Sequence, residues 1–408
     1  MQLKWCAVVV TAGLIGIGLA GCGGSGSAQT ASIPGLGTSL PGGTAGVPAV
    51  RVAAGSIYMG VFDNVSNDEP NAAAHPDIAL LETQIGRREA IDMHYVAWKN
   101  LASVNPLAAN NVGSCPIGSC IDLYNDKMQG RIPLIAWNCG DTDANVAAGV
   151  DDPIIEASAA AMKAYKNPIM LRWFWEMNLD NTDQNRTGSG QNCYNGSYDG
   201  ANGSTGRPDY FDGVTYVKAW RHIWSVFHNL GVTNVIWVWN PGDSNIQDAP
   251  LYWPGSQYVD WIGGDVYDRS DLGLAAELDN APVPVPLPPS PLPHVTPYSL
   301  YGILTNLDPS KPLIIAENGA HTDWATSGLG STNQERYFGA STYGADYVLK
   351  QHSRIHAYDY FDADETIVNG ITVAPPPEVA DDWDLTNTGI AAYKAFVNGP
   401  YESLTAVP

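Results

Sequence analysis

Short apolar runs alternate with polar or helical stretches from residue 57 to residue 362. The runs are rich in Val, Ile, Trp and Tyr, and most of them end in Gly, Asn or Asp, which is typical of buried strands. Eight strands are predicted, at 57–64, 90–98, 132–140, 168–178, 234–242, 260–267, 312–320 and 355–362. The segments 154–166 and 214–230 have helical spacing, and the second stops at Gly231. This alternation predicts a single-domain α/β fold, a (β/α)8 TIM barrel.

The composition excludes several classes of protein. The chain has 20 Lys and Arg residues against 42 Asp and Glu residues, which gives a net charge of −22. Nucleic acids and anionic lipid surfaces need basic patches, so we expect neither as a partner. The hydrophobic share of 45% is too high for a disordered chain.

The N-terminus has the pattern of an exported bacterial lipoprotein. Lys4 is followed by an apolar stretch at 6–20, and small residues precede Cys22. We predict that residues 1–21 are a signal peptide and that Cys22 carries the lipid. This anchor would be the only contact with a membrane, and it would place the protein in the cell envelope. An ordinary signal peptide that happens to contain a Cys is the alternative.

The remaining organisation follows from composition. Residues 22–50 are rich in Gly, Ser and Pro and are predicted to form a flexible tether. The barrel domain is predicted at 51–400, with a C-terminal tail at 401–408. Two long loops are expected after strands four and six, at 179–213 and 280–297. The second is rich in Pro and could either wall a substrate cleft or decorate the surface.

Four Cys residues remain in the exported domain: Cys115, Cys120, Cys139 and Cys193. An even number in an oxidising compartment suggests two disulfides. Three connectivities are open, and the pairing of Cys115 with Cys120 and of Cys139 with Cys193 is favoured. A zinc site is disfavoured because the first pair has no second close pair to complete it.

Two Glu residues follow apolar and aromatic runs at the ends of predicted strands. Glu176 comes at the end of strand four and Glu317 at the end of strand seven. Active sites of (β/α)8 barrels lie at the carboxyl ends of the strands, and these two strands face each other across the mouth. A buried Glu is costly unless it is paired or functional. Either Glu alone could be a structural ion pair, but two convergent carboxylates are typical of glycoside hydrolysis.

Further polar and aromatic residues lie at or near predicted strand ends. Trp137, Trp175 and Trp239 could stack on sugar rings, because indoles offer large apolar faces. Asp265 could bind sugar hydroxyls, and His94 could line the cleft. Core packing or a loop cap is the alternative in each case.

Four longer segments carry a more specific signal. They are RWFWEMN at 172–178, YWPGSQYVDWIGGDVY at 252–267, KPLIIAENG at 311–319 and DWDLTNTGIAAYKAF at 382–396. Together they resemble glycoside hydrolase family 26, which belongs to the large clan of retaining barrel glycosidases. The resemblance extends over roughly residues 55–400.

This resemblance implies a role for particular residues. Glu176 would be the general acid/base and Glu317 the nucleophile, with Tyr267 as a hydrogen-bond partner of the nucleophile. The implied activity is endo-β-1,4-mannan hydrolysis. Separately from the resemblance, we expect a monomer that needs no cofactor and no metal. Some members of the family act on β-1,3-xylan or mixed-linkage β-glucan.

Physical reasoning is compatible with these roles. Arg172 shares strand parity with Glu176 and should point into the barrel near Glu317, where a cation would favour a charged nucleophile. The aromatic neighbours Trp173 and Trp175 would favour the protonated form of the acid. We predict a carboxyl separation of about 5–5.5 Å and retention of configuration.

Two positions depart from the family pattern. The family usually has His immediately before the acid/base, whereas this chain has Trp175, which offers one N–H donor and no acceptor. The family's Trp at the end of strand eight is absent, so Tyr360 or Phe361 would have to form the sugar platform. Two alternatives therefore stay open. They are a hydrolase of another β-glycan or bacterial exopolysaccharide, and a catalytically inactive polysaccharide-binding lipoprotein.

Overall fold

The structure is a computed structural model, and the chain divides into the units Met1–Pro34 and Gly35–Pro408. The described residues belong to the second unit. They are 36–37, 49–50, 56–63, 78–103, 123–139, 142–178, 213–243, 246–268, 273–279, 299–320, 333–339, 344–363, 367–368, 371–372, 383–399 and 402–403. The predicted signal peptide, Cys22 and nearly all of the two long loops lie outside them. Within the described ranges, no helix is both long and apolar enough to cross a membrane.

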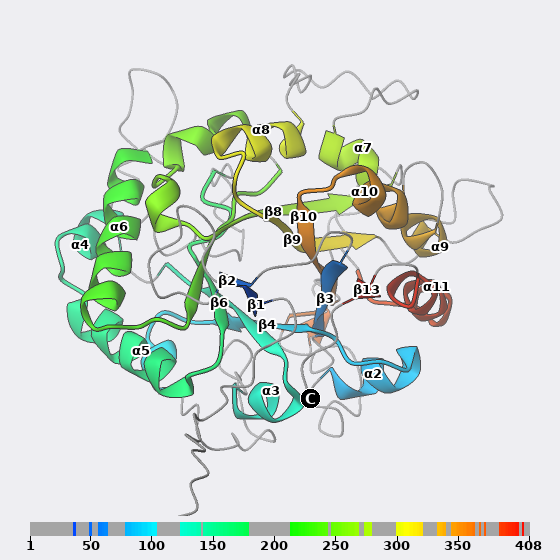
Figure 1. Cartoon of the computed structure of the whole chain (residues 1–408), viewed down its shortest axis with the longest axis horizontal. Coiled ribbons are helices and arrows are strands. Elements are labelled where there is room, and N and C mark those ends of the chain that lie inside the picture. The colour runs from blue at the N-terminus through cyan, green and yellow to red at the C-terminus, as the bar shows by residue number, and fades with distance from the viewer. Residues whose placement is uncertain are drawn as a thin grey trace, which may run out of the picture. The chain divides into compact units, whose positions relative to one another are not determined.

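Eight parallel strands form a closed barrel (Figure 1). They are β3 (Ser56–Asp63), β4 (Ile91–Val96), β5 (Ile132–Trp137), β6 (Ile169–Trp173), β7 (Val235–Trp239), β8 (Trp261–Asp268), β9 (Leu313–Ala320) and β10 (Ile355–Asp362). Each pairs in parallel with the next, and β10 pairs with β3 to close the ring. All eight predicted strands are therefore confirmed, and with them the (β/α)8 barrel.

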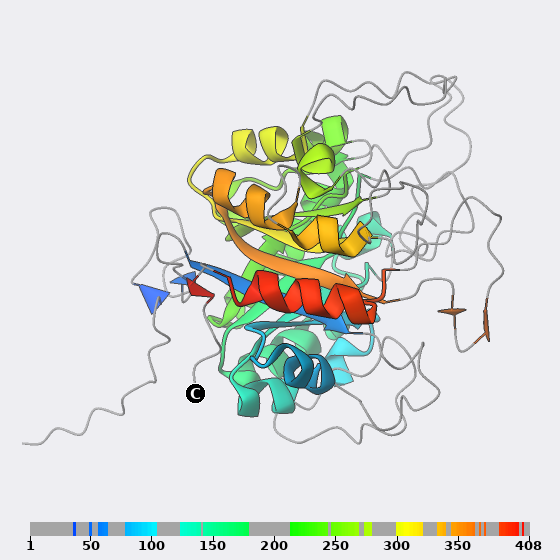
Figure 2. The same ribbon diagram turned by 90° about the vertical axis from the view of Figure 1, so that its right-hand side faces the viewer.

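Helices surround the strands (Figure 1). They are α2 (Ala79–Ile85), α3 (Leu123–Gln129), α4 (Asp143–Ala147), α5 (Asp152–Tyr165), α6 (Gly213–Asn229), α7 (Leu274–Asp279), α8 (Leu300–Leu307), α9 (Asn333–Phe338), α10 (Ala345–Gln351) and α11 (Asn387–Val397). Helices α5 and α6 match the two helical predictions. Gly231 follows α6 with a φ of 66°, a left-handed conformation that favours glycine at helix ends. Figure 2 shows α11 lying along the outside of the barrel.

Apolar side chains fill two separate layers. Met170 of β6 and Phe361 of β10 belong to the cluster inside the barrel. Their chain neighbours Leu171 and Tyr360 belong to the cluster between the strands and the helices. Successive residues of a strand point to opposite faces, so parity decides which side chains can reach the mouth of the barrel.

Short pairings occur in segments that composition predicts to be unstructured. β13 (Glu402–Ser403) lies in the predicted C-terminal tail and pairs in parallel with the start of β3. β1 (Leu36–Gly37) and β2 (Ala49–Val50) pair within the predicted tether. β11 (Ile367–Val368) and β12 (Ile371–Thr372) form a further antiparallel pair. Two-residue pairings need backbone hydrogen bonds rather than an apolar core, so composition gives no sign of them.

Candidate active site

A β-bulge places Glu317 inside the barrel. Gly264 of β8 pairs with Ile315 of β9, but the next residue, Asp265, pairs with Glu317, so β9 contains one extra residue. That extra residue, Ala316, already belongs to the interior cluster. Bulges re-aim side chains and are frequent beside active sites. Here the bulge lets two consecutive residues contribute to the interior, and the second is the predicted nucleophile.

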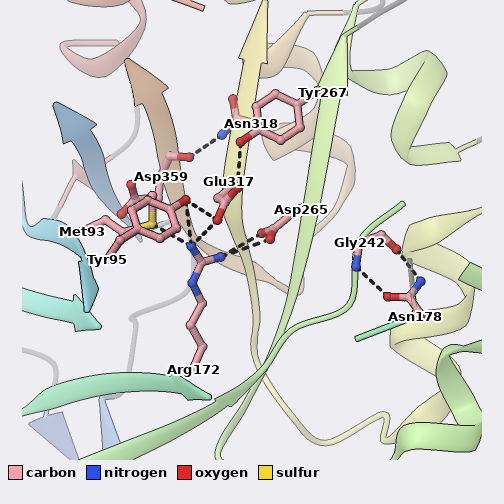
Figure 3. Close-up of polar contacts among 10 residues, drawn as sticks. All are labelled: Met93, Tyr95, Arg172, Asn178, Gly242, Asp265, Tyr267, Glu317, Asn318 and Asp359. Carbon is pink, nitrogen blue, oxygen red and sulfur yellow. Dashed lines mark hydrogen bonds and ion pairs between the residues drawn. The ribbon is translucent and has the colours of Figure 1, made fainter. Parts of the chain in front are cut away.

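Three side chains from three strands hold the carboxylate of Glu317 (Figure 3). The hydroxyl of Tyr267 donates to Oε2 at 2.7 Å. The hydroxyl of Tyr95 and Nη2 of Arg172 both donate to Oε1. The expected contacts of Tyr267 and Arg172 with Glu317 are therefore present. Tyr95, on β4, is a contact that sequence reasoning missed.

Arg172 joins Glu317 to a second buried carboxylate. Nη1 of Arg172 lies 3.1 Å from each oxygen of Asp265. Burial alone would lower the pKa of Arg172, but the charges of Glu317 and Asp265 outweigh it and raise that pKa well above its ordinary value. Burial raises the pKa of Asp265, and the charge of Glu317 adds to this shift while Arg172 opposes it. Asp265 thus lies in a buried ion pair, and its predicted contact with sugar stays a prediction.

Glu176 follows β6 in an unusual backbone conformation. The strand ends at Trp173, five residues before the predicted end. Phe174 and Glu176 then have φ values of 47° and 56°. This left-handed region is uncommon for residues other than glycine. Glu176 therefore projects from a turn and not from the strand. The prediction that Glu176 and Arg172 point to the same face of one strand is wrong for this reason.

Hydrogen bonds to neighbouring strand ends fix that turn. The N–H of Glu176 donates to the carbonyl of Asn240 at 2.7 Å, just beyond β7. The Asn178 side-chain amide donates to the Gly242 carbonyl and accepts from the Gly242 N–H, both at 2.9 Å (Figure 3). Strained residues persist where the surrounding contacts over-determine them, which is common at functional sites.

The carboxylates of Glu176, Asp265 and Glu317 converge. One oxygen of each lies within 4.8 Å of the others. By distance alone such a group could hold a metal ion, but the Arg172 guanidinium already supplies a cation between Asp265 and Glu317. A second such group, Asp92 with His94 and Asp126, also has an arginine beside it, Arg131.

Aromatic rings cover one side of this cluster. The Arg172 guanidinium lies 5.4 Å from the Trp175 ring and 5.6 Å from the Tyr95 ring, within the range of cation–π attraction. Phe361 packs against Tyr95 and Tyr267, with ring centroids 6.1 and 5.9 Å apart. Trp175 therefore lies beside the guanidinium that binds Glu317, and Phe361 extends the same apolar wall. The predicted contact of Trp175 with sugar stays a prediction.

Three predicted sugar-binding residues lie elsewhere. Trp137, Trp239 and Tyr360 are fully buried between the strands and the helices. Their polar atoms donate to the backbone carbonyls of Trp98, Tyr252 and Trp383, respectively. The prediction that they contact substrate is wrong, because their strand parity points them away from the barrel interior. Trp173 faces the same outer layer and stacks on Tyr216, so it does not desolvate Glu176.

The same parity rule corrects His94. Its Nε2 lies 2.8 Å from Asp126 of α3, on the helix side of β4. The neighbouring Tyr95 points inward instead. The alternation along β4 is the signal that could have identified Tyr95 from sequence.

Only one of the four cysteines predicted to form disulfides lies among the described residues. Cys139 is disulfide-bonded. The other three predicted partners, Cys115, Cys120 and Cys193, lie outside the described residues. The pairing of Cys139 with Cys193 stays a prediction.

One segment of the chain matches the model of a known protein family. Residues 203–280 match the model of glycosyl hydrolase family 26. Over this segment the chain is similar to glycosyl hydrolase family 26. The matched segment contains Asp265, a member of the carboxylate cluster, and Tyr267, which donates to Glu317. It includes the motif at 252–267, so the match supports the family resemblance over this part of the chain.

Individual relatives are distant. Endoglucanase H of Acetivibrio thermocellus is 31% identical over 150 residues, which is 36% of this chain but only 14% of that protein. A family 26 β-mannanase from Bacteroides ovatus has 13% identity and a TM-score of 0.51, covering 86% of this chain and 90% of that one. A ruminal family 26 endo-β-1,4-mannanase has 14% identity and a TM-score of 0.50, covering 90% and 70%. At these identities the two structures show the shared barrel fold.

Proposed function

We propose that the chain is a retaining glycoside hydrolase that cleaves internal β-1,4 linkages of mannan or a closely related β-glycan. The main support for this proposal is the short distance between Glu176 and Glu317, whose carboxylate oxygens come within 4.8 Å of each other. Retaining glycosidases hold their two carboxyl groups about 5–5.5 Å apart, whereas inverting enzymes need roughly 6.5–9.5 Å to admit a water molecule. The short separation supports double displacement.

In the first step, Glu317 attacks the anomeric carbon while Glu176 gives its proton to the leaving oxygen. The glycosidic bond breaks, and an ester forms between the sugar and Glu317. Tyr95, Tyr267 and Arg172 hold the attacking carboxylate in one orientation. Fixed donors of this kind need no reorganisation during the reaction.

In the second step, Glu176 acts as a base. It takes a proton from water, the water oxygen attacks the anomeric carbon, and Glu317 leaves as a carboxylate. Glu176 is partly exposed whereas Glu317 is buried. This difference supports the assignment, because the acid/base must meet both the leaving group and the incoming water.

The substrate is proposed to be an uncharged polymer. The net charge of −22 repels anionic polysaccharides. The apolar wall of Trp175, Tyr95 and Phe361 suits the C–H face of a sugar ring. Mannan is favoured by the similarity to two mannanases. A β-glucan is the second candidate, because the matched segment of Endoglucanase H is the more similar in sequence.

The test is polysaccharide hydrolysis by the full chain. Mannan, glucomannan, β-1,3-xylan, mixed-linkage β-glucan and bacterial exopolysaccharides would be compared for released oligosaccharide. Glu176→Ala and Glu317→Ala should abolish release, whereas Glu156→Ala, on the exposed face of α5, should not. Binding of one polymer without release from any would instead support a polysaccharide-binding lipoprotein.

We also propose that the protein acts from the cell envelope as a monomer anchored through Cys22. The support is the apolar stretch of the signal pattern and the small residues before that Cys. Palmitate labelling should mark the wild type and be lost in Cys22→Ser. Light scattering of the purified chain should give the monomer mass.

A further inference from the structure

Asp359 is a carboxylic acid that the reaction does not use. It lies on β10 between Ala357 and Phe361, both of which belong to the interior cluster, so its side chain shares their face. The residue is fully buried. Within the described part of the chain, neither carboxylate oxygen has a hydrogen-bond partner.

A glycine on the neighbouring strand leaves room for the side chain of Asp359. Asp359 pairs in register with Gly60 of β3. A Cβ atom at Gly60 would lie 2.5 Å from Oδ2 of Asp359 and 2.5 Å from Cβ of Ile91, closer than real Cβ contacts allow. Glycine therefore leaves the space that the carboxyl group fills.

Three charged or ionisable groups act on Asp359 from the surrounding elements. They are Arg172 of β6, Glu317 of β9 and Glu89, which precedes β4. Figure 3 shows Asp359 on β10, together with Met93 and Tyr95 of β4 and the Arg172 guanidinium. Arg172 is already bonded to Glu317 and Asp265.

Electrostatics opposes the charged form of this group. Burial raises the pKa of Asp359 well above its ordinary value; Arg172 opposes this shift, and the charges of Glu89 and Glu317 add to it. An ionised carboxylate without a hydrogen-bond donor is among the most costly groups to bury, whereas the protonated acid is far less so.

We propose that Asp359 is a positioning residue that stays a neutral carboxylic acid inside the barrel and thereby reserves the charge of Arg172 for Glu317 and Asp265. Loss of its proton would set a third buried carboxylate in competition for one guanidinium. The Arg172 contact that orients the nucleophile would weaken. Formation of the glycosyl–enzyme would then slow at alkaline pH, independently of the protonation of Glu176.

The first test measures the protonation state directly. The full chain would be labelled with ¹³C at the side-chain carboxyl of aspartate, which leaves Glu residues silent. The carboxyl resonance of Asp359, assigned by its absence in Asp359→Asn and its persistence in Asp265→Asn, should keep the chemical shift of the protonated acid at pH 7. A resonance at the shift of an ionised carboxylate at pH 7 would overturn the proposal.

The second test measures the positioning effect and rests on the proposed hydrolase activity. Dinitrophenyl β-mannobioside has a leaving group that departs without a proton, so kcat/KM for it no longer depends on protonated Glu176. The wild type should lose at least threefold in kcat/KM at alkaline pH, and Asp359→Asn should not show this decrease. The acid limb, where the nucleophile ionises, should fall at the same pH in both.

Each outcome separates the two proposals. An alkaline limb that is identical in wild type and Asp359→Asn would refute the positioning role. An acid limb displaced to lower pH in Asp359→Asn would also refute it, because it would mean that Asp359 is charged in the wild type. Absence of turnover with a normal aspartate titration would overturn both proposals, whereas absence of turnover with a protonated Asp359 would count only against the hydrolase.

Discussion

Nη1 of Arg172 lies 3.1 Å from both carboxylate oxygens of Asp265, while Nη2 of the same guanidinium donates to Glu317. A single buried cation thus links two buried carboxylates that come from adjacent strands. Removing one member of such a group leaves an uncompensated charge, which costs more than the intact ion pair contributes. The site is therefore an electrostatic unit, and its members should show coupled effects.

The coupling predicts non-additive stability. Arg172→Met should lower the free energy of unfolding by about 3–5 kcal/mol, because Glu317 and Asp265 lose their shared cation. Adding Asp265→Asn should recover more than about 1 kcal/mol, since it removes one of the stranded charges. Urea unfolding of both single variants and the double variant measures this. Additive losses would show that Arg172 and Asp265 do not act as a pair.

The two tyrosines should contribute to catalysis rather than to stability. Tyr95→Phe and Tyr267→Phe each delete a donor to Glu317, and hydrogen bonds to charged groups contribute roughly 1.5–3 kcal/mol. Each variant should lose about 10- to 100-fold in kcat/KM. Steady-state kinetics on the polymer identified by hydrolysis checks this.

A matched control is available in the same barrel. Tyr58 also lies in the interior cluster, and its hydroxyl has no hydrogen-bond partner among the described residues. Tyr58→Phe should change kcat/KM less than threefold. An equal loss in this variant would mean that the effects of Tyr95 and Tyr267 come from general disturbance of the barrel.

Two tryptophans should respond differently to the same substitution. Trp239→Phe replaces a buried indole by a smaller ring and deletes the Nε1 hydrogen bond to the Tyr252 carbonyl, so it should lower stability by about 1–3 kcal/mol and leave KM unchanged. Trp175→Phe shortens the wall beside Arg172 and should raise KM several-fold. Thermal melts and kinetics on both variants separate these outcomes. A raised KM in Trp239→Phe would contradict this account, because it would show that Trp239 contacts the sugar.

Glu89 should make stability depend on pH. Burial raises its pKa from 4.5 to about 7, and Tyr393 donates to it at 3.0 Å. The folded state therefore holds this proton more tightly than the unfolded chain, so stability should fall as pH rises from about 4.5 to about 7. At about 1.36 kcal/mol per unit, the loss is roughly 3 kcal/mol.

The substitution Glu89→Gln should remove the contribution of Glu89 to this pH dependence, whereas Asp359 and Asp265, whose pKa values burial also raises, keep theirs. Urea unfolding at pH 4.5 and pH 8 should show the variant gaining relative to the wild type at the higher pH. Glu156→Gln, on an exposed face, is the control and should follow the wild type. A wild type with the same pH dependence as Glu89→Gln would show that Glu89 is not the group responsible.

The fold could be predicted from the sequence because strands of a buried parallel sheet consist of continuous apolar runs. All eight runs became strands, and Arg172 contacts Glu317 as predicted, although the strand parity with Glu176 on which that prediction rested does not hold. Glu176 and Glu317 could be found because each follows such a run at the end that carries barrel active sites.

Other parts of the site had no such signature. The bulge in β9 and the left-handed turn at Phe174 and Glu176 depend on hydrogen bonds between neighbouring strand ends, which no local pattern records. Trp137, Trp239 and Tyr360 were misplaced because proximity to a strand end was given more weight than parity. The role of Asp359 could not be predicted from its local sequence, because it depends on Gly60 and Arg172, which lie on other strands of the barrel.

The central claim is double displacement by Glu317 and Glu176. Proton NMR of the first sugar anomer released from mannan, or from the polymer that the chain hydrolyses, tests it most directly. Retention predicts that the β-anomer appears first and converts slowly to the equilibrium mixture. Initial appearance of the α-anomer would establish inversion and contradict the assignment of Glu317 as the nucleophile.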